Sequence, residues 1–278
     1  MNFSQKRSPS QSSGRWVLPP LRLGQVNAAG TETLALVEKQ LMALALKAQP
    51  LMVDVADYQH FTKTARYQER WPAYFPKNLA EKSLEHYLAI RLLQPTRHDR
   101  FMDVAAGNSP LAEIVEELVG CEAYAQDLIF PSGVHGRYVG GDACSLPFPA
   151  GTVSKVALTC SFEHFECDAD IRLFAELSRV LCAGGKVVII PLYLNSYHAI
   201  QVDPDAYCDS LEVDPFSVIH LAPGWGNRYG RFYSPQSLLE RIIQRFSNAF
   251  QFQLWRLVNT DALSPAIYAR WLLSAARL

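Results

Sequence analysis

Hydrophobic positions in the first third of the chain recur with helical spacing. Within residues 31–47 the apolar side chains fall three or four positions apart on one stripe, which predicts an amphipathic helix. A second helix is predicted over residues 78–93, because Asn78 is a typical N-cap and Glu81 follows three positions later, as in a capping box. A single amphipathic helix cannot bury its stripe alone, so we expect residues 15–77 to form a helical cover and not an independent domain.

From residue 100 onward, short apolar segments alternate with amphipathic ones. Strands followed in turn by helices predict a doubly wound, mostly parallel sheet, here of seven strands. The last two strands are joined by a short polar turn, so they predict a closing antiparallel hairpin. A helix capped by Ser234 precedes this hairpin. The predicted strands are 100–105, 123–128, 138–141, 153–160, 186–192, 250–258 and 266–273, and the predicted helices between them include 110–119 and 171–182.

Composition narrows the class of protein. The chain has 278 residues, of which 49% are hydrophobic, with 26 basic and 27 acidic residues. This balance offers no basic patch for nucleic acid or an anionic membrane. No apolar run approaches the ~20 residues of a membrane-spanning helix, and the N-terminus lacks the order of a signal peptide. Cysteines and histidines show no metal-binding spacing. We therefore expect a cytoplasmic protein without a metal, whose Ser-rich residues 1–14 form a disordered tail.

The loop after the first of these strands has the character of a ligand site. It reads DVAAGNSP from Asp103 to Pro110, and a helix follows at once. Small residues let the backbone approach a ligand closely, and the helix N-terminus offers free N–H groups. Open α/β sheets bind ligands at this edge. Asp127, near the end of the next strand, suits hydrogen bonds to ribose hydroxyls. With a single glycine, the loop alone is a weak signal.

The segments that follow strengthen this interpretation. The series GDA, LPFP, SFEHF, LSRVL and GGK occurs in this order between residues 141 and 186. As a set, the series resembles class I S-adenosylmethionine (SAM)-dependent methyltransferases of the type that acts on small molecules. The resemblance covers residues 80–192 well and 234–278 loosely. It implies a Rossmann-like SAM-binding domain over residues 78–278, with a small-molecule acceptor as the partner.

The resemblance also implies which residues hold the cofactor. Asp127, with Leu128 beside it, would hold the ribose, and Asp142 with the backbone of Ala143 would meet the adenine edge. Ser161 and Phe162 would line the wall near the sulfonium, although Phe162 also suits the core. The residues implied at the amino-acid end of SAM are Asp103, Ala105, Ala106 and Gly107.

Two departures from the family pattern keep alternatives open. Ala105 and Ser109 stand at the first and third glycine positions of the loop, and alanine adopts a positive φ only at a cost. The alternative from another class is therefore a catalytically silent, SAM-binding partner protein. A nicotinamide-dependent oxidoreductase is a further alternative, but it should show G-x-G-x-x-G after the first strand, which this chain lacks.

The insert 193–233 is predicted to be an irregular lid that selects the acceptor. It is rich in aromatic residues and more acidic than basic, which suits a neutral or weakly charged, partly aromatic small molecule. Methyl transfer needs mainly alignment and exclusion of water, and a base only if the acceptor must lose a proton. For such a base, His198, His220 and Tyr193 in the insert are favoured over His164.

Overall fold

The computed structural model describes residues 3–5, 19–205 and 211–278. These residues form two compact units. The unit that we call the sheet unit comprises residues 47–162, 171–192 and 243–278. The other, which we call the insert unit, comprises the described residues up to Leu46 together with 163–170 and 193–242.

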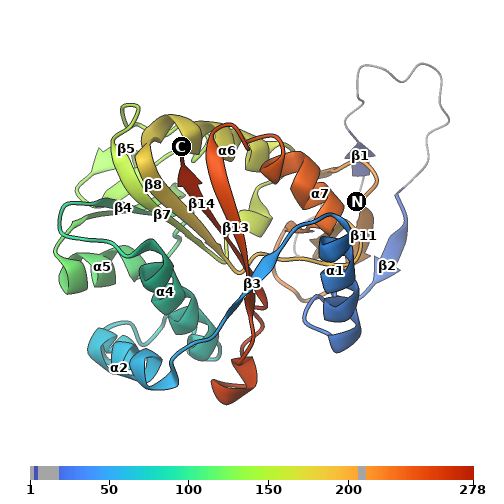
Figure 1. Ribbon diagram of the computed structural model, residues 1–278, viewed down its shortest axis with the longest axis horizontal. Coiled ribbons are helices and arrows are strands. Elements are labelled where there is room, and N and C mark those ends of the chain that lie inside the picture. Colours follow the sequence, from blue (N-terminus) through green and yellow to red (C-terminus); the bar gives the residue numbers. More distant parts are fainter. Residues whose placement is uncertain (1–2, 6–18, 206–210) are drawn as a thin grey trace. The chain divides into compact units, whose positions relative to one another are not determined.

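The sheet unit is built around eight strands in the order β3-β13-β14-β8-β7-β4-β5-β6 (Figure 1). All neighbours pair in parallel except β14, which is antiparallel to both β13 and β8. The doubly wound sheet and its closing hairpin are thus confirmed, and β3 adds an edge strand beyond the seven expected. The strands are β3 (Ala48–Leu51), β4 (Arg100–Val104), β5 (Glu122–His135), β6 (Tyr138–Gly140), β7 (Val153–Thr159), β8 (Leu181–Ile190), β13 (Phe250–Leu257) and β14 (Trp271–Arg277).

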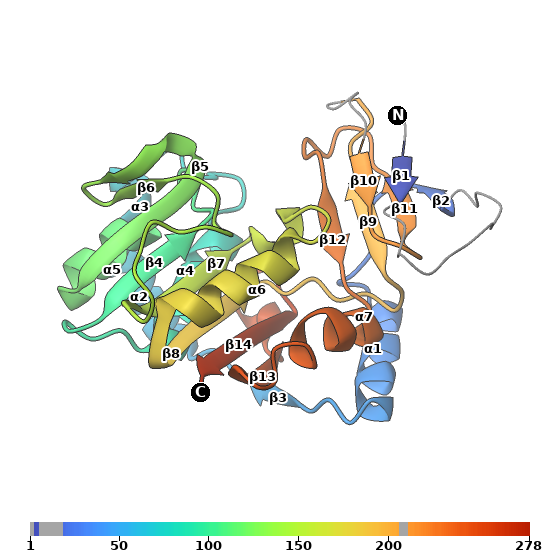
Figure 2. The same cartoon turned by 90° about the horizontal axis from the view of Figure 1, so that it is seen from above.

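Helices cover both faces of this sheet. In Figures 1 and 2, α4 and α5 lie on one face and α6 lies on the other. On the α6 face, the ring of Phe174 packs against Phe250 and Phe252 of β13. The two-sided cover explains why the central strands are apolar on both sides. The helices are α2 (Val55–Ala65), α3 (Tyr67–Arg70), α4 (Leu79–Leu93), α5 (Leu111–Val119) and α6 (Ala169–Val180), of which residues 171–180 belong to this unit, and a 3₁₀ turn spans Thr260–Ala262.

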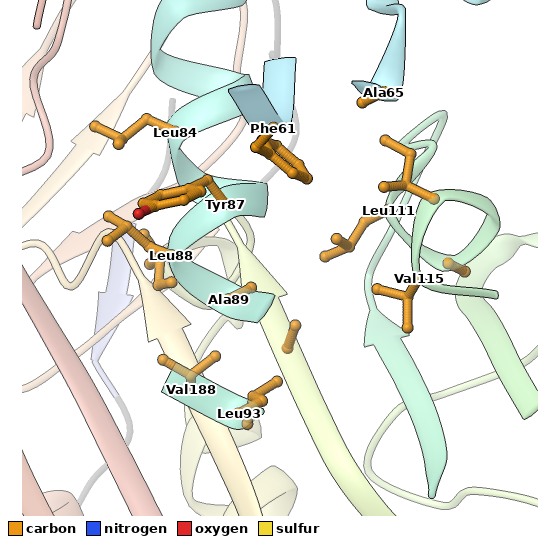
Figure 3. Close-up of a cluster of buried hydrophobic side chains, with 14 of the residues drawn as sticks. Phe61, Ala65, Leu84, Tyr87, Leu88, Ala89, Leu93, Leu111, Val115 and Val188 are labelled. Atoms are coloured by element: carbon orange, nitrogen blue, oxygen red, sulfur yellow. The ribbon is translucent and has the colours of Figure 1, made fainter. Parts of the chain in front are cut away.

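The core on the other face lies around α4 (Figure 3). Leu84 and Leu88 of α4 are at most 2% exposed, and Leu111 and Val115 of α5 are fully buried. Val188 of β8 lies beneath the same helix (Figure 3). Each fully buried aliphatic side chain contributes about 1.5–3 kcal/mol, so this apolar contact holds the helix layer on the sheet.

The insert unit contains a smaller sheet in the order β12-β9-β11-β2 and a two-stranded pair β1-β10. Within it, α1 contacts α7. Ser234 caps α7 as predicted, because its hydroxyl accepts the N–H of Ser237 at 3.1 Å. The elements are β1 (Phe3–Gln5), β2 (Leu21–Leu23), α1 (Thr31–Ala43), β9 (Ala199–Val202), β10 (Leu211–Val213), β11 (Val218–Leu221), β12 (Gly230–Phe232), α7 (Pro235–Leu238) and a π-helical turn at Leu239–Ile243, while a 3₁₀ turn spans Phe162–His164.

The predicted domain boundaries differ from those of the structure. Residues 15–77 are not one helical cover, because β3 pairs with β13 and draws residues from Lys47 onward into the sheet unit. The segment 193–233 is not irregular, since it supplies strands β9 to β12. Most of the predicted tail 1–14 lies outside the described residues, but Phe3–Gln5 forms a strand paired with β10.

Two local predictions are also wrong. Asn78 precedes α4 but makes no side-chain cap. Glu81, expected in a capping box, instead accepts the backbone N–H groups of Tyr268 at 2.8 Å and Ala269 at 3.2 Å. These bonds hold residues 268 and 269 in a loop, so the last strand begins at Trp271 and not at the predicted residue 266.

Candidate cofactor site

The residues predicted to hold a cofactor gather at one edge of the sheet unit. Strands β4, β5, β6 and β7 are parallel neighbours, so their carboxyl ends meet at the same edge. Asp103 is the penultimate residue of β4, and Asp127 and Leu128 lie within β5, just beyond Gln126, which pairs with the last residue of β4. The other predicted cofactor residues lie in the segments that follow β4, β6 and β7, and they are Ala105, Ala106, Gly107, Asp142, Ala143, Ser161 and Phe162.

The loop after β4 adopts the conformation that glycines would give it. Ala105 has φ +53° and Gly107 has φ +54°, both left-handed. The N–H of Ala105 donates to Oε1 of Gln126 at 3.1 Å, and the N–H of Ala106 donates to the carbonyl of Gln126 at 2.9 Å. Alanine pays about 1–2 kcal/mol for this backbone, and these two bonds help to hold it there. Gln126 was not predicted from the sequence, which indicated only the adjacent Asp127.

Asp103 is a fully buried carboxylate without a neutralising partner. Its side chain is 0% exposed, and neither of its oxygens has a hydrogen-bond partner among the described residues. Burial raises the pKa of this carboxyl to about 7, and the negative charge of Asp127 contributes in the same direction. An ionised carboxylate in such a place is costly unless a cation meets it. The site therefore fits an ammonium group, such as that at the amino-acid end of SAM.

Asp127 joins the loop after β4 to strand β5. Its Oδ2 accepts the N–H of Gly107 at 2.7 Å, and its Oδ1 accepts the N–H of Ile129 at 3.1 Å. A carboxylate has about four acceptor positions, so hydroxyl donors can still bind to it. Beside it, the side chain of Leu128 is 74% exposed, which leaves an apolar surface next to the carboxylate.

Asp142 follows β6 and organises the turn there. Its Oδ1 accepts the N–H of Cys144 at 2.9 Å, and its Oδ2 lies 3.4 Å from the Arg172 guanidinium. Burial alone would raise the pKa of Asp142, but these two donors outweigh it and lower the pKa. The side chain stays half exposed and can accept from a ligand, whereas Ala143 is buried.

The two residues after β7 have different surroundings. Ser161 is buried and donates its hydroxyl to the carbonyl of Val104 at 3.2 Å, so it links the ends of β7 and β4. Phe162 is 2% exposed and packs edge-on against Phe174, with 5.9 Å between ring centroids. Phe162 is thus a core residue of the sheet unit in this structure.

The candidate bases lie in the insert unit, and their ring nitrogens or rings are already engaged. His198 bonds to Oδ2 of Asp214 at 2.8 Å and to the hydroxyl of Ser237 at 2.9 Å. In His220, Nδ1 donates to the carbonyl of Gly24 and Nε2 accepts the hydroxyl of Tyr197, both at 3.0 Å. These contacts make the two histidines part of the unit's internal hydrogen bonding.

The other two candidates are also held locally. Nδ1 of His164 donates to the carbonyl of Tyr229 at 2.5 Å, and its Nε2 lies 3.6 Å from Glu163. The ring of Tyr193 packs against Phe232 at 5.0 Å. The four candidates thus contact different partners within the insert unit.

Sequence reasoning missed a set of buried polar residues on α4. Glu81, Lys82, Glu85 and His86 are each at most 6% exposed, although their positions look like the polar face of an amphipathic helix. The Lys82 ammonium pairs with both carboxylate oxygens of Glu85 at 3.1 and 3.2 Å. The run of aromatic residues in 58–75 was a partial signal, because Tyr67 and Tyr74 bond to His86 and the ring of Phe75 lies 5.4 Å from the Lys82 ammonium.

Over the parts of the chain that the structure describes, no group of three or more His, Cys, Asp or Glu side chains is arranged to hold a metal ion. Likewise, none of the helices seen in these parts is long and apolar enough to cross a membrane.

Comparison with known proteins agrees with the site. Residues 102–189 match the family model of methyltransferase domains. A demethylmenaquinone methyltransferase of Thermus thermophilus is 32% identical over 115 residues, which are 37% of this chain and 51% of that protein. The chain thus spans about half the length of this relative. The resemblance to class I SAM-dependent methyltransferases inferred from the motifs is thus confirmed over residues 102–189, which match a methyltransferase domain.

Solved structures with more distant sequences are similar over longer stretches. A 1,6-didemethyltoxoflavin-N1-methyltransferase of Burkholderia thailandensis is 16% identical, covers 83% of this chain and 92% of its own, and has a TM-score of 0.49. The geranyl diphosphate C-methyltransferase of Streptomyces coelicolor is 13% identical, covers 70% of this chain and 75% of its own, and has a TM-score of 0.42.

Proposed function

We propose that this protein is a methyltransferase that binds SAM at the carboxyl edge of β4 to β7 and transfers its methyl group to a small-molecule acceptor. The observation that carries the proposal is the buried carboxylate of Asp103, which has no hydrogen-bond partner among the described residues. It lies just before a left-handed loop whose backbone is bonded to Gln126 and Asp127 of β5. An ammonium group placed there would neutralise the carboxylate and offset the cost of its burial.

The residues of the chain divide the binding of SAM among them. Asp103 would hold the ammonium, Asp127 the ribose hydroxyls, and Asp142 the adenine edge, with Leu128 as an apolar contact for the base. When bound, SAM supplies a methyl group on a positively charged sulfur, which is already activated for in-line displacement. The protein then has to align the acceptor and exclude water, which requires no conspicuous catalytic dyad.

The departures at Ala105 and Ser109 do not argue against cofactor binding in this fold. Ala105 adopts the positive φ that a glycine would supply. A catalytically silent binder remains the second candidate function, because a cofactor site alone does not establish turnover. Methyl transfer from radiolabelled SAM to a panel of small hydroxy, amino and enolic compounds would separate the two.

The ribose assignment predicts the effect of one substitution. Asp127→Ala removes acceptors for the ribose hydroxyls and should weaken SAM binding by about 1–3 kcal/mol, or roughly 5- to 150-fold. Asp261→Ala, at an exposed position in the same unit, is the matched control and should leave the affinity unchanged. Calorimetric titration of both folded variants is the measurement, and equal affinities for SAM would refute the ribose assignment.

The four candidate bases, His198, His220, Tyr193 and His164, remain predictions. Single alanine variants assayed with an accepted substrate decide among them. A true base should lose turnover while SAM affinity is kept, and its loss should be smaller at high pH, where the acceptor ionises without help. If turnover survives in all four variants, the acceptor needs no base from this set.

A further inference from the structure

A buried histidine connects α4 to the loop of the cofactor site. His86 is 0% exposed and makes three side-chain contacts within the sheet unit. Its Nδ1 lies 2.8 Å from the hydroxyl of Tyr67, and its Nε2 lies 3.1 Å from the hydroxyl of Tyr74 and 3.2 Å from that of Ser109. Ser109 belongs to the loop after β4, at the third of the positions where related loops carry glycine.

His86 and the two tyrosines that contact it are uncharged near pH 7. Burial, together with the nearby Lys82 cation, lowers the pKa of His86 to about 3. The imidazole is therefore neutral near pH 7, so that one ring nitrogen donates and the other accepts. The hydroxyls of both Tyr67 and Tyr74 are buried beside it and also lack a charge, because burial raises their pKa values. The result is a neutral network of fixed dipoles with His86 at its centre.

The network ends at the start of α5. The hydroxyl of Ser109 accepts the N–H of Leu111 at 3.2 Å, at the start of this helix. The order in space is therefore Tyr67, His86, Ser109 and the N-terminus of α5, and it runs from the aromatic layer to the loop after β4.

We propose that His86 is a positioning residue for the cofactor: through Ser109 it fixes the loop after β4 that receives the amino-acid end of SAM. This proposal rests on the proposed function, since it takes SAM as the ligand. Ser109 then replaces a loop glycine with a hydroxyl that has a partner, and His86 is that partner. Because His86 contacts this loop and not the residues assigned to the ribose or the adenine, its removal should affect only one end of the ligand.

Two ligands separate this role from a purely structural one. SAM carries the ammonium and carboxylate of methionine, whereas 5′-methylthioadenosine has the same nucleoside without the amino-acid end. His86→Leu should weaken SAM binding about tenfold, the equivalent of one polar interaction, and leave the affinity for methylthioadenosine unchanged. His86→Gln keeps an amide donor and acceptor and should restore most of the SAM affinity. His60→Leu, at an exposed position on α2, is the control.

A double-mutant cycle tests whether the effect passes through Ser109. Ser109→Gly removes the hydroxyl, and in that background His86→Leu should cause little further loss of SAM affinity. If the two losses instead add, or if His86→Leu weakens SAM and methylthioadenosine equally, the positioning role is wrong. If His86→Leu does not fold, the affinities of His86→Gln and Ser109→Gly for SAM and for methylthioadenosine are compared instead. A loss of SAM affinity in Ser109→Gly without a loss of methylthioadenosine affinity then supports the role, and equal losses contradict it. A folded wild-type protein that binds neither ligand contradicts the proposed function instead.

Discussion

At the scale of single residues, the site combines side chains whose folded state is unfavourable on its own. Asp103 is a buried carboxylate, and Ala105 has a positive φ. Such features persist when ligand binding requires them. The motif predicted both positions from the sequence, because it indicates where a loop must turn. It could not predict the contacts of Gln126 or His86, since their partners come from other elements.

The Asp103 carboxylate should therefore lower the stability of the fold while it contributes to SAM binding. Because the folded-state pKa of about 7 exceeds the ordinary value of 3.8, the carboxyl costs little below pH 4 and destabilises the fold increasingly as the pH rises to 7. Asp103→Asn should raise the free energy of unfolding by up to about 4 kcal/mol at pH 8, and by clearly less at pH 5, while SAM binding is lost. Denaturant unfolding at both pH values checks this, and a variant that is less stable than wild type at pH 8 would contradict it.

His86 has the opposite dependence on pH. Its folded-state pKa of about 3 lies below the ordinary 6.5, so its contribution is intact above pH 6.5 and is lost as the pH falls. The stability cost of His86→Gln should therefore shrink by about 2 kcal/mol between pH 8 and pH 5. The measurement is the difference in unfolding free energy between wild type and variant at the two pH values. A cost that is independent of pH would show that His86 titrates in the fold with its ordinary pKa, and it would contradict the buried, neutral imidazole.

At the scale of elements, hydrophobic periodicity predicted most of the alternating strands and helices. It failed where a polar residue determines the path of the backbone. The predicted last strand began at residue 266 because the segment is apolar, but Glu81 binds the N–H groups of residues 268 and 269 and delays the strand. It also gave no sign that the charged positions of α4 are buried. Neither effect leaves a periodic signal in the sequence.

In the insert unit, one buried cation joins several elements. Arg231 of β12 is 0% exposed and lies 2.6 Å from Asp214 and 3.2 Å from Asp170. Its guanidinium also donates to the carbonyls of Phe165 at 2.8 Å and Cys167 at 2.6 Å. Arg231→Met leaves buried carboxylates and carbonyls without this donor, so it should destabilise the insert unit by about 3–5 kcal/mol.

The same strand region supplies a control for that substitution. Arg228 pairs with Glu166 at 2.8 Å, but both side chains are about one-third exposed. Arg228→Met should therefore cost less than about 1 kcal/mol. Thermal unfolding of both variants, followed by circular dichroism, measures the contrast. Equal losses of stability would contradict the assignment of Arg231 as the ion that holds the insert unit together.

At the scale of the whole molecule, the sequence predicted the class of fold but not its division into units. The mostly parallel sheet and its antiparallel hairpin follow from the alternation of elements and the family motifs, whereas the order of the strands comes from the structure alone. The split of residues 15–77 depends on β3, which pairs with β13 some 200 positions later, as in Ala48 opposite Leu254. Short strands with half-exposed faces give too little pattern to predict such a distant pairing.

The central claim is that the loops after β4 to β7 form a SAM site, and calorimetric titration of the wild-type protein tests it most directly. We predict saturable binding of SAM and of S-adenosylhomocysteine with one site per chain, and no binding of NADH. Asp103→Asn should remove this binding while the protein stays folded. A folded wild-type protein that binds NADH, or that gives no heat with SAM or its demethylated product, would contradict the account.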